Sequence, residues 1–232
     1  MKNILITGGS KGIGRAIAER FAQAGFNIAL VARNLEGLER AQLELTTKFP
    51  QIEVLVFAAD LGKADEAIKV AQTMSSHWQQ VDVVVNNAGL FRQGALLTEP
   101  AENLVKMIEV NLYGPYHLTR ALRPYVSKHG HIFNICSVAS KKSFIGSGSY
   151  AVSKHAILGF TRALRLELEE EAIKVTAVMP GATWTSSWDE SDIDQNRIMK
   201  GSDIAEAIYG AWNTGPSTVV EEIVLRPQLG DL

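Results

Sequence analysis

The sequence predicts an α/β protein, a single domain with a doubly wound, mostly parallel sheet of about seven strands and helices on both faces. Short runs rich in β-branched residues alternate with longer segments of helical period, which is the pattern of successive βαβ units. Most of the short runs are apolar throughout, as strands are when helices cover both faces of a parallel sheet. The chain has 232 residues, 46% of them hydrophobic, and no linker-like stretch divides it. Residues 1–232 are therefore expected to fold as one domain.

The alternation of strand and helix begins with the first residues. Residues 3–7 are an apolar run that ends at a glycine-rich turn, and residues 12–24 follow with helical period. Each later strand is bounded in the same way by turn residues, and each later helix by a return of the 3.6-residue apolar spacing. The expected strands are residues 3–7, 27–32, 53–58, 81–85, 131–136, 174–178 and 218–225. The expected helices are residues 12–24, 35–48, 63–78, 100–127, 150–171 and 202–213.

Residues 181–201 follow the sixth expected strand and show no clear period. This segment is rich in Thr, Ser, Asp and Trp, and its length is more typical of a binding loop than of a passive connection. The alternative is a disordered surface loop, in which Trp184 and Trp188 would be costly residues to leave in water. We interpret the segment as a candidate substrate loop.

Composition excludes several classes of function. The chain carries 23 Lys and Arg against 25 Asp and Glu, and it has no basic stripe, so we expect no nucleic-acid partner. Cys136 is the single cysteine, and the five histidines do not have metal-ligand spacing, so neither a disulfide framework nor a metal site is expected. The apolar runs are too short for a signal peptide or a membrane span. These features are typical of a cytoplasmic protein.

The first expected strand and helix are joined by the turn Thr7-Gly8-Gly9-Ser10-Lys11-Gly12-Ile13-Gly14. Its glycines allow the backbone to turn sharply and to come close to a pyrophosphate, whose charge the positive end of the following helix favours. The spacing differs from the G-x-G-x-x-G pattern, and a purely structural turn is the alternative. Between a first strand and a first helix, the turn favours a Rossmann-like dinucleotide site. Its candidate cofactor-binding residues are Gly8, Ser10, Lys11, Gly12, Ile13 and Gly14.

The end of the second expected strand indicates which dinucleotide binds. An NAD enzyme needs a carboxylate there for the ribose hydroxyls, but this chain has Arg33, with Lys11 in the glycine turn. A guanidinium and an ammonium suit a 2′-phosphate, so NADP(H) is the expected cofactor, unless both residues are merely solvated cations. Asp60, at the end of the third strand, could accept a hydrogen bond from the adenine amino group or could cap its own loop.

Tyr150 and Lys154 lie four residues apart at the start of an expected helix, so they share one face of it. A free tyrosine is almost entirely protonated at neutral pH, and a nearby ammonium stabilises the phenolate by Coulomb attraction. The pair is therefore a candidate general acid–base. Ser137 follows the fifth strand at the edge where ligands bind in doubly wound sheets. No His or carboxylate is placed to make it a nucleophile, which favours a role in polarising a carbonyl.

Together these motifs resemble those of the short-chain dehydrogenases/reductases, and the resemblance covers nearly the whole chain. The matching residues are Thr7-Gly8-x-x-x-Gly12-x-Gly14, Asn86-Asn87-Ala88-Gly89, Asn111, Ser137, Tyr150-x-x-x-Lys154 and Pro180-Gly181, in the order and spacing of the family. The resemblance implies that Tyr150 donates a proton to a carbonyl oxygen while NADPH delivers a hydride to the carbon. It also implies that Ser137 orients the oxygen and that Asn111 holds a water in a proton relay. Tyr150 and Lys154 would both contact the cofactor, with Lys154 on the nicotinamide ribose.

The same resemblance implies further cofactor contacts and partners. Asn86 and Gly89 would belong to the motif that lies on the adenosine side and stabilises the sheet, and Asn87, Ala88 and Gly89 would bind the cofactor. The nicotinamide amide would be held by Pro180, Gly181, Thr183 and Thr185. The substrate would be a small-molecule carbonyl or alcohol, and the chain would form a homodimer or homotetramer through two of its helices.

The carboxyl-terminal end separates subgroups of this family. Residues 219–227 are followed by only five more, which looks more like bacterial sepiapterin-reductase-like members than like typical 3-oxoacyl-[acyl carrier protein] reductases. The latter activity remains an alternative. An alternative from another class is a non-catalytic NADP(H)-binding sensor, which would need the glycine turn but could lose the Tyr150–Lys154 pair.

Overall fold

Seven parallel strands form one sheet in the computed structural model, which describes residues 1–185, 188 and 192–231. The order across the sheet is β3-β2-β1-β4-β5-β6-β7, and every neighbouring pair is parallel. The strands are β1 (Asn3–Thr7), β2 (Asn27–Ala32), β3 (Val54–Ala58), β4 (Val81–Asn86), β5 (Val126–Ile135), β6 (Lys174–Pro180) and β7 (Glu222–Leu225). The predicted doubly wound fold class is confirmed.

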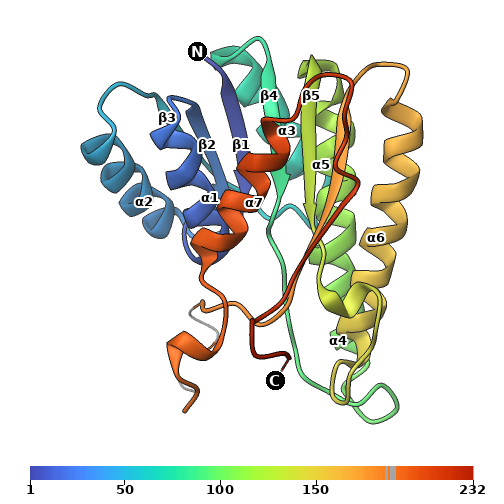
Figure 1. The fold of residues 1–232 in the computed structure, drawn as a ribbon. Coiled ribbons are helices and arrows are strands. Elements are labelled where there is room, and N and C mark those ends of the chain that lie inside the picture. Colours follow the sequence, from blue (N-terminus) through green and yellow to red (C-terminus); the bar gives the residue numbers. More distant parts are fainter. Residues whose placement is uncertain (186–187, 189–191, 232) are drawn as a thin grey trace.

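Helices cover both faces of this sheet (Figure 1). One face carries α1 (Gly12–Gln23), α2 (Leu35–Lys48) and α7 (Gly201–Trp212). The other carries α3 (Ala64–His77), α4 (Glu102–Ile108), α5 (Gly114–Leu122) and α6 (Gly148–Leu168). The strand order reverses between β1 and β4, and such a switch opens a crevice at the carboxyl ends of the strands.

Alternation along the strands supplies two cores, one for each layer of helices. In β1, Ile4 and Ile6 pack toward α1 and α7, whereas Leu5 packs toward α3 and α5. Successive strand residues point to opposite faces, and all three side chains are fully buried. Each such side chain stabilises the fold by about 1.5–3 kcal/mol.

The prediction of one continuous helix over residues 100–127 is wrong. It is divided into α4, a π-helical turn at Glu109–Tyr113, α5 and a 3₁₀ turn at Arg123–Tyr125. The π-helical turn contains Asn111, whose side chain bonds to groups outside the helix. Pro124 lacks the N–H that would continue the helix.

Two strand predictions also need correction. The fifth strand begins at Val126, five residues earlier than predicted, because Val126 already pairs with Val81. The pairing shifts register between Val81 and Val83, and His129 has a φ of 66° there, so the apolar alternation that marks a strand in the sequence is interrupted. The last strand is shorter than predicted, at Glu222–Leu225. The other predicted strands and helices are present, with ends that differ by at most three residues, and residues 3–7, 27–32 and 35–48 match at both ends.

His131 lies at the centre of the sheet and is fully buried. Its Nε2 lies 2.7 Å from Thr176 Oγ1, and its ring stacks on Phe133 with centroids 3.8 Å apart. Thr176 gives its own hydroxyl proton to Val220 O, so Nε2 donates to Thr176. Burial lowers the pKa of His131 from 6.5 to about 3, which keeps the ring neutral in the fold.

This buried histidine predicts acid sensitivity. Below pH 6.5 His131 binds a proton in the unfolded chain but stays neutral in the folded chain. The free energy of unfolding therefore falls as the pH is lowered. Between pH 7 and pH 5 we expect His131 to contribute about 2 kcal/mol of this loss. His131→Gln should remove that contribution in urea unfolding at the two pH values, whereas the exposed His77→Gln should not. An unchanged pH dependence in His131→Gln would contradict the prediction.

Candidate active site

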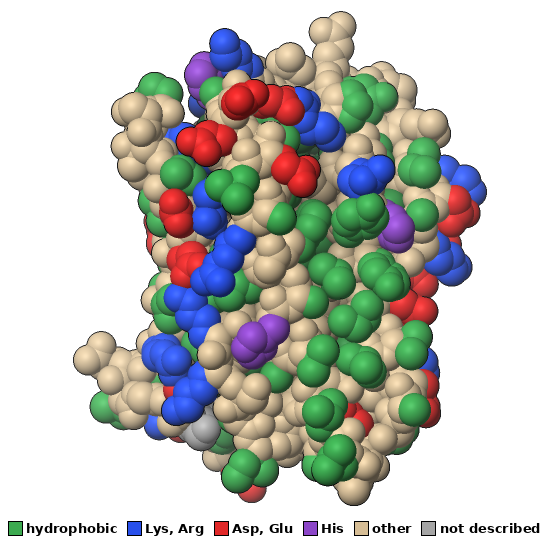
Figure 2. Space-filling view, turned by 90° about the vertical axis from the view of Figure 1, so that its right-hand side faces the viewer, with side chains coloured by type: hydrophobic (Ala, Val, Ile, Leu, Met, Phe, Trp, Pro, Cys, Tyr) green, Lys and Arg blue, Asp and Glu red, His purple; other side chains and the backbone are tan. Residues whose placement is uncertain are grey.

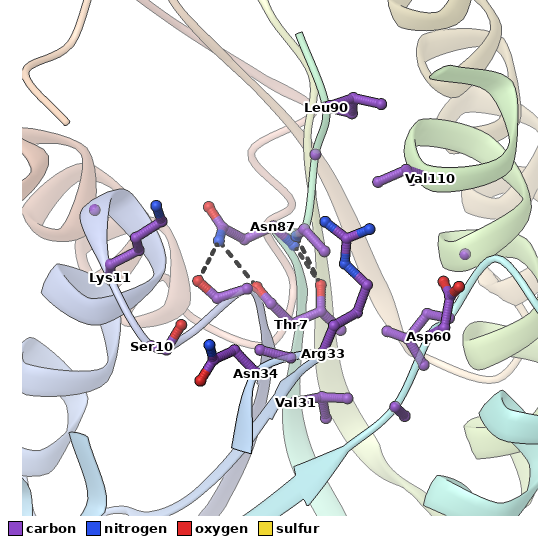
Figure 3. Close-up of a pocket in the computed structure, with 18 of the residues that line it drawn as sticks. Thr7, Ser10, Lys11, Val31, Arg33, Asn34, Asp60, Asn87, Leu90 and Val110 are labelled. Carbon is purple, nitrogen blue, oxygen red and sulfur yellow. Dashed lines mark hydrogen bonds between the residues drawn. The ribbon is translucent and has the colours of Figure 1, made fainter. Parts of the chain in front are cut away.

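A cleft of about 910 Å³ opens at the carboxyl ends of the central strands. Figure 3 shows its walls, which come from the glycine turn, the ends of β2 and β3, and the segment after β4. Eleven of the predicted cofactor-binding residues line this cleft: Gly8, Ser10, Lys11, Gly12, Ile13, Arg33, Asp60, Asn87, Ala88, Gly89 and Thr185. The tertiary structure therefore brings most of the predicted cofactor site together.

The glycine turn has the backbone that a pyrophosphate cradle needs. Gly8 and Gly12 have φ values of 64° and 59°, a region that side chains disfavour. Gly14 does not line the cleft but lies beneath the turn, where a Cβ would come within 2.4 Å of Gly8 O. Lys11, the N-cap residue of α1, makes no capping hydrogen bond with its side chain. The turn therefore fits an anionic group placed against the amino end of α1.

Thr7 and Asn87 join the glycine turn to the segment after β4. Thr7 Oγ1 accepts hydrogen bonds from Asn87 N at 2.9 Å and Ala88 N at 2.8 Å. Asn87 Nδ2 donates to Thr7 O at 2.9 Å and to Gly8 O at 3.2 Å, as the dashed lines in Figure 3 mark. These contacts fix the floor of the cleft. Sequence reasoning missed Thr7 as a site residue, although its position directly before the first glycine was a signal.

Arg33 and Lys11 place two cations beside the cleft. In Figure 3 the Arg33 side chain rises from the end of β2 into the cleft, between Asn87 and Asp60, and Lys11 lies across from it. Asn34 also lines the cleft and caps α2 by accepting from Gly37 N at 2.7 Å. The local positive charge suits a phosphate near the end of β2.

The structure places Asp60 where it can cap its own loop and also face a ligand in the cleft. Its Oδ1 accepts a hydrogen bond from Gly62 N at 3.2 Å, which is the loop-capping role. The residue also lines the cleft, so a hydrogen bond to a bound base stays a prediction.

Tyr150 and Lys154 lie on one face of α6, as their spacing predicts. The Nζ of Lys154 is 5.7 Å from the centroid of the Tyr150 ring. It donates to Ile135 O at 2.9 Å, and the lysine is 5% exposed. Phe91 packs edge-on against Tyr150, and the centroids of the two rings are 4.8 Å apart. The phenol and the ammonium are thus held together near the carboxyl end of β5.

Asn111 reaches the same place from the π-helical turn. Its Oδ1 accepts from Leu90 N at 2.7 Å, and its Nδ2 donates to Leu90 O and to Ser153 Oγ, both at 2.9 Å. A Cβ built on Gly89 would lie 3.5 Å from Asn111 Oδ1 and 3.7 Å from Lys154 Nζ. Asn111 therefore connects the segment after β4 with α6 and, like the Lys154 ammonium, lies against Gly89. Asn111 lies in the π-helical turn, and such turns occur frequently at functional sites.

Ser137 lies just past β5, where the sequence predicts it. It caps the 3₁₀ turn Val138–Ser140 by accepting from Ala139 N at 3.1 Å, and its own N–H donates to Ser140 Oγ. The hydroxyl proton can still be donated to another acceptor. Burial raises the pKa of the neighbouring Cys136 to about 11, which rules against a thiolate nucleophile at neutral pH.

The segment after β6 lies against the glycine turn. Pro180 ends β6, Gly181 N donates to Leu225 O, and Thr183 pairs with Met199. Thr185 lies against the turn, since a Cβ on Gly12 would be 3.3 Å from its Cγ2. The first three of these residues do not line the cleft.

The candidate substrate loop, residues 181–201, is closed at its base. Trp184 N donates to Met199 O, and Met199 N donates to Ala182 O. Residues 186–187 and 189–191 of this loop lie outside the described residues.

In the described ranges no helix is long and apolar enough to cross a membrane.

Comparison with known proteins identifies the class that this fold and site define. The family model for short chain dehydrogenases matches residues 2–196. The sepiapterin reductase of Chlorobaculum tepidum is 35% identical over 100% of this chain and 99% of its own length. The human 3-oxoacyl-[acyl-carrier-protein] reductase is 34% identical over 84% of this chain and 80% of its own.

A solved structure shows the same architecture. The alcohol dehydrogenase of the archaeon Thermococcus sibiricus, complexed with 5-hydroxy-NADP, superposes with a TM-score of 0.90 at 30% identity and covers 98% of this chain and 97% of its own. The chain belongs to the short-chain dehydrogenase family and is an oxidoreductase. The family resemblance predicted from the motifs is confirmed.

Proposed function

We propose that this protein is an NADP(H)-dependent carbonyl reductase or alcohol dehydrogenase in which Tyr150 is the general acid–base. The observation that carries the proposal is the Tyr150–Lys154 pair, with Lys154 Nζ 5.7 Å from the phenol ring. A non-catalytic sensor would have no need for a buried ammonium beside a tyrosine. Burying the Lys154 ammonium costs free energy, which its hydrogen bond to Ile135 O offsets in part, and buried charges of this kind cluster at functional sites.

The cleft supports NADP(H) as the cofactor. The glycine turn would hold the pyrophosphate against the amino end of α1, and Arg33 with Lys11 would hold the 2′-phosphate. Structural neighbours such as the Thermococcus sibiricus enzyme were solved with an NADP derivative. When bound, the cofactor supplies the hydride that is added to the carbonyl carbon.

The chain's own residues would move the proton. The hydroxyl of Tyr150 donates its proton to the carbonyl oxygen, and Lys154 stabilises the phenolate that remains. Ser137, just past β5, would hold the same oxygen by a hydrogen bond. Asn111, which lies against Gly89 as Lys154 does, would order the water that returns a proton to the site. Pro180, Gly181, Thr183 and Thr185 would hold the nicotinamide amide, and residues 181–201 would face the substrate.

A panel of carbonyl compounds tests the proposal. With saturating NADPH, we expect oxidation of the cofactor, followed by absorbance at 340 nm, for at least one ketone, diketone, quinone or pterin. An acyl-carrier thioester in the same panel tests the 3-oxoacyl-[acyl carrier protein] alternative. Tight NADPH binding without turnover of any member would favour the sensor and contradict the proposal.

We further propose that a second copy of the chain covers the face built by α5 and α6. Figure 2 shows hydrophobic side chains gathered on this side of the molecule. The exposed residues on α4, the π-helical turn, α5 and α6 are Leu104, Val105, Tyr113, Tyr116, Val152 and Leu166, each more than a third exposed. A contiguous apolar patch of this kind is typical of a protein interface.

Charge placed on this face should separate the copies. In light scattering after size exclusion, we expect a homodimer or homotetramer for the parent and a smaller species for the Val105→Asp/Leu166→Asp variant. Leu43→Asp, an exposed apolar position on α2, should leave the mass unchanged. A parent that elutes as a monomer would refute the interface.

A further inference from the structure

The first turn of α6 receives its cap from Glu99, which lies 50 residues earlier in the chain. Glu99 Oε1 accepts hydrogen bonds from Ser149 N at 2.8 Å and from Ser149 Oγ at 2.6 Å. Ser147, the N-cap residue by position, gives no cap, because its hydroxyl bonds to Phe144 N and Phe144 O instead. One carboxylate thus satisfies a helix N–H that would otherwise have no partner within the helix. We call these two hydrogen bonds the Glu99–Ser149 clasp.

The backbone around the clasp is shaped to admit the carboxylate. A Cβ on Gly94 would lie 2.7 Å from Glu99 Oε2, and a Cβ on Gly148 would lie 2.6 Å from Glu99 Oε1. Gly148 also has a φ of 23°, outside the range that side chains prefer. Both glycines therefore make room for Glu99, and a side chain at either position would displace it.

The charge of Glu99 is stabilised where it lies. The hydroxyl and the backbone N–H of Ser149 hold the pKa of Glu99 below its usual value, and the positive end of α6 favours an anion. The side chain of Asn103 lowers the pKa of Glu99 further through a hydrogen bond.

The clasp joins the two segments that flank Tyr150. Gly94 pairs with Ser147, and Gly94 N donates to Gly146 O at 2.9 Å, so the segment after β4 lies beside the segment before α6. Phe91, in the first segment, packs against the Tyr150 ring. Ser149, in the second, directly precedes Tyr150 in α6.

We propose that Glu99 is a positioning residue for Tyr150, acting through Ser149 and the first turn of α6. The inference rests on the proposed function of Tyr150 as the acid–base. Without the clasp, the first turn of α6 and the loop carrying Phe91 can shift relative to the sheet. A misplacement of about 1 Å at a reacting group can cost about 10²-fold in rate.

Two variants test the role of Glu99. We expect Glu99→Ala to lower kcat by about 10- to 100-fold with the best carbonyl of the panel, while the Kd for NADPH changes by less than about twofold, because the cofactor cleft contains no part of the clasp. Glu99→Gln keeps an acceptor oxygen for both donors of Ser149 and should restore kcat to within about threefold of the parent. Amide hydrogen exchange in the first turn of α6, measured without substrate, should be faster in Glu99→Ala and near the parent rate in Glu99→Gln.

Asp82→Ala is the matched control. Asp82 likewise accepts from a backbone N–H and a serine hydroxyl, those of Asn3 and Ser127, at the opposite end of the sheet. The Asp82→Ala variant should lose stability but keep the parent kcat. A Glu99→Ala enzyme with the parent kcat, a loss equal to that of Asp82→Ala, or a loss that Glu99→Gln does not restore would overturn the proposal.

Tyr150→Phe, assayed beside these variants, separates the two claims. If it is inactive and Glu99→Ala is fully active, only the positioning role fails. If it keeps full activity, the proposed function fails.

Discussion

Tyr150→Phe is expected to lower kcat by about 10² to 10⁴-fold, the usual contribution of a positioned general acid. The substitution removes one hydroxyl and keeps the ring, so the edge-on contact with Phe91 should persist. Tyr150 does not line the cleft that contains the glycine turn, Arg33 and Lys11. The Kd for NADPH, measured by fluorescence titration, should therefore stay within about twofold of the parent value.

Tyr209→Phe is the control for the chemistry of the substitution. Tyr209 lies on α7, on the other face of the sheet, and packs against Phe21. It should keep the parent kcat. If Tyr150→Phe keeps it too, the proton comes from another group, and the proposed mechanism is wrong.

Arg33→Ala should weaken NADPH binding by about 10- to 100-fold, because a charge-assisted hydrogen bond contributes about 1.5–3 kcal/mol. NADH has no 2′-phosphate, so its Kd should change little, and the preference between the two cofactors should fall by the same factor. Titration of both cofactors at fixed ionic strength measures the effect, since salt screens such contacts.

Arg40→Ala serves as the comparison for Arg33. Arg40 is an exposed cation on α2 that pairs with Glu36, and it does not line the cleft. Its removal should leave both dissociation constants unchanged. Equal weakening of NADPH and NADH by Arg33→Ala, or a parent enzyme that prefers NADH, would exclude the proposed phosphate contact.

Local patterns carried most of the fold prediction. Apolar runs such as Asn27–Ala32 are buried on both faces, so their strand character is visible without knowledge of their neighbours. The same is true of Tyr150 and Lys154, because four residues of helix bring two side chains to one face wherever the helix lies. Arg33 and the glycine turn were also predictable, since the end of a strand defines their position.

Predictions failed where a contact from another segment overrides the local pattern. Residues 100–127 have helical spacing throughout, but Asn111 bonds to Leu90 and Ser153 and lies in a π-helical turn that interrupts the helix. The start of β5 was missed because Val126 becomes a strand residue only by pairing with Val81. No periodicity within either segment carries that information.

The amino-acid sequence by itself determined the order of strands and helices, the family, and the residue types available for proton transfer and phosphate binding. The tertiary structure decided how segments distant along the chain meet. Thr7 and Asn87 are 80 residues apart in the chain and are hydrogen-bonded to each other, and Glu99 caps α6 at Ser149, 50 residues away. Hydrogen bonds depend on distance and angle in space, and a carboxylate or a threonine has the same appearance in a sequence whether or not such a partner is near.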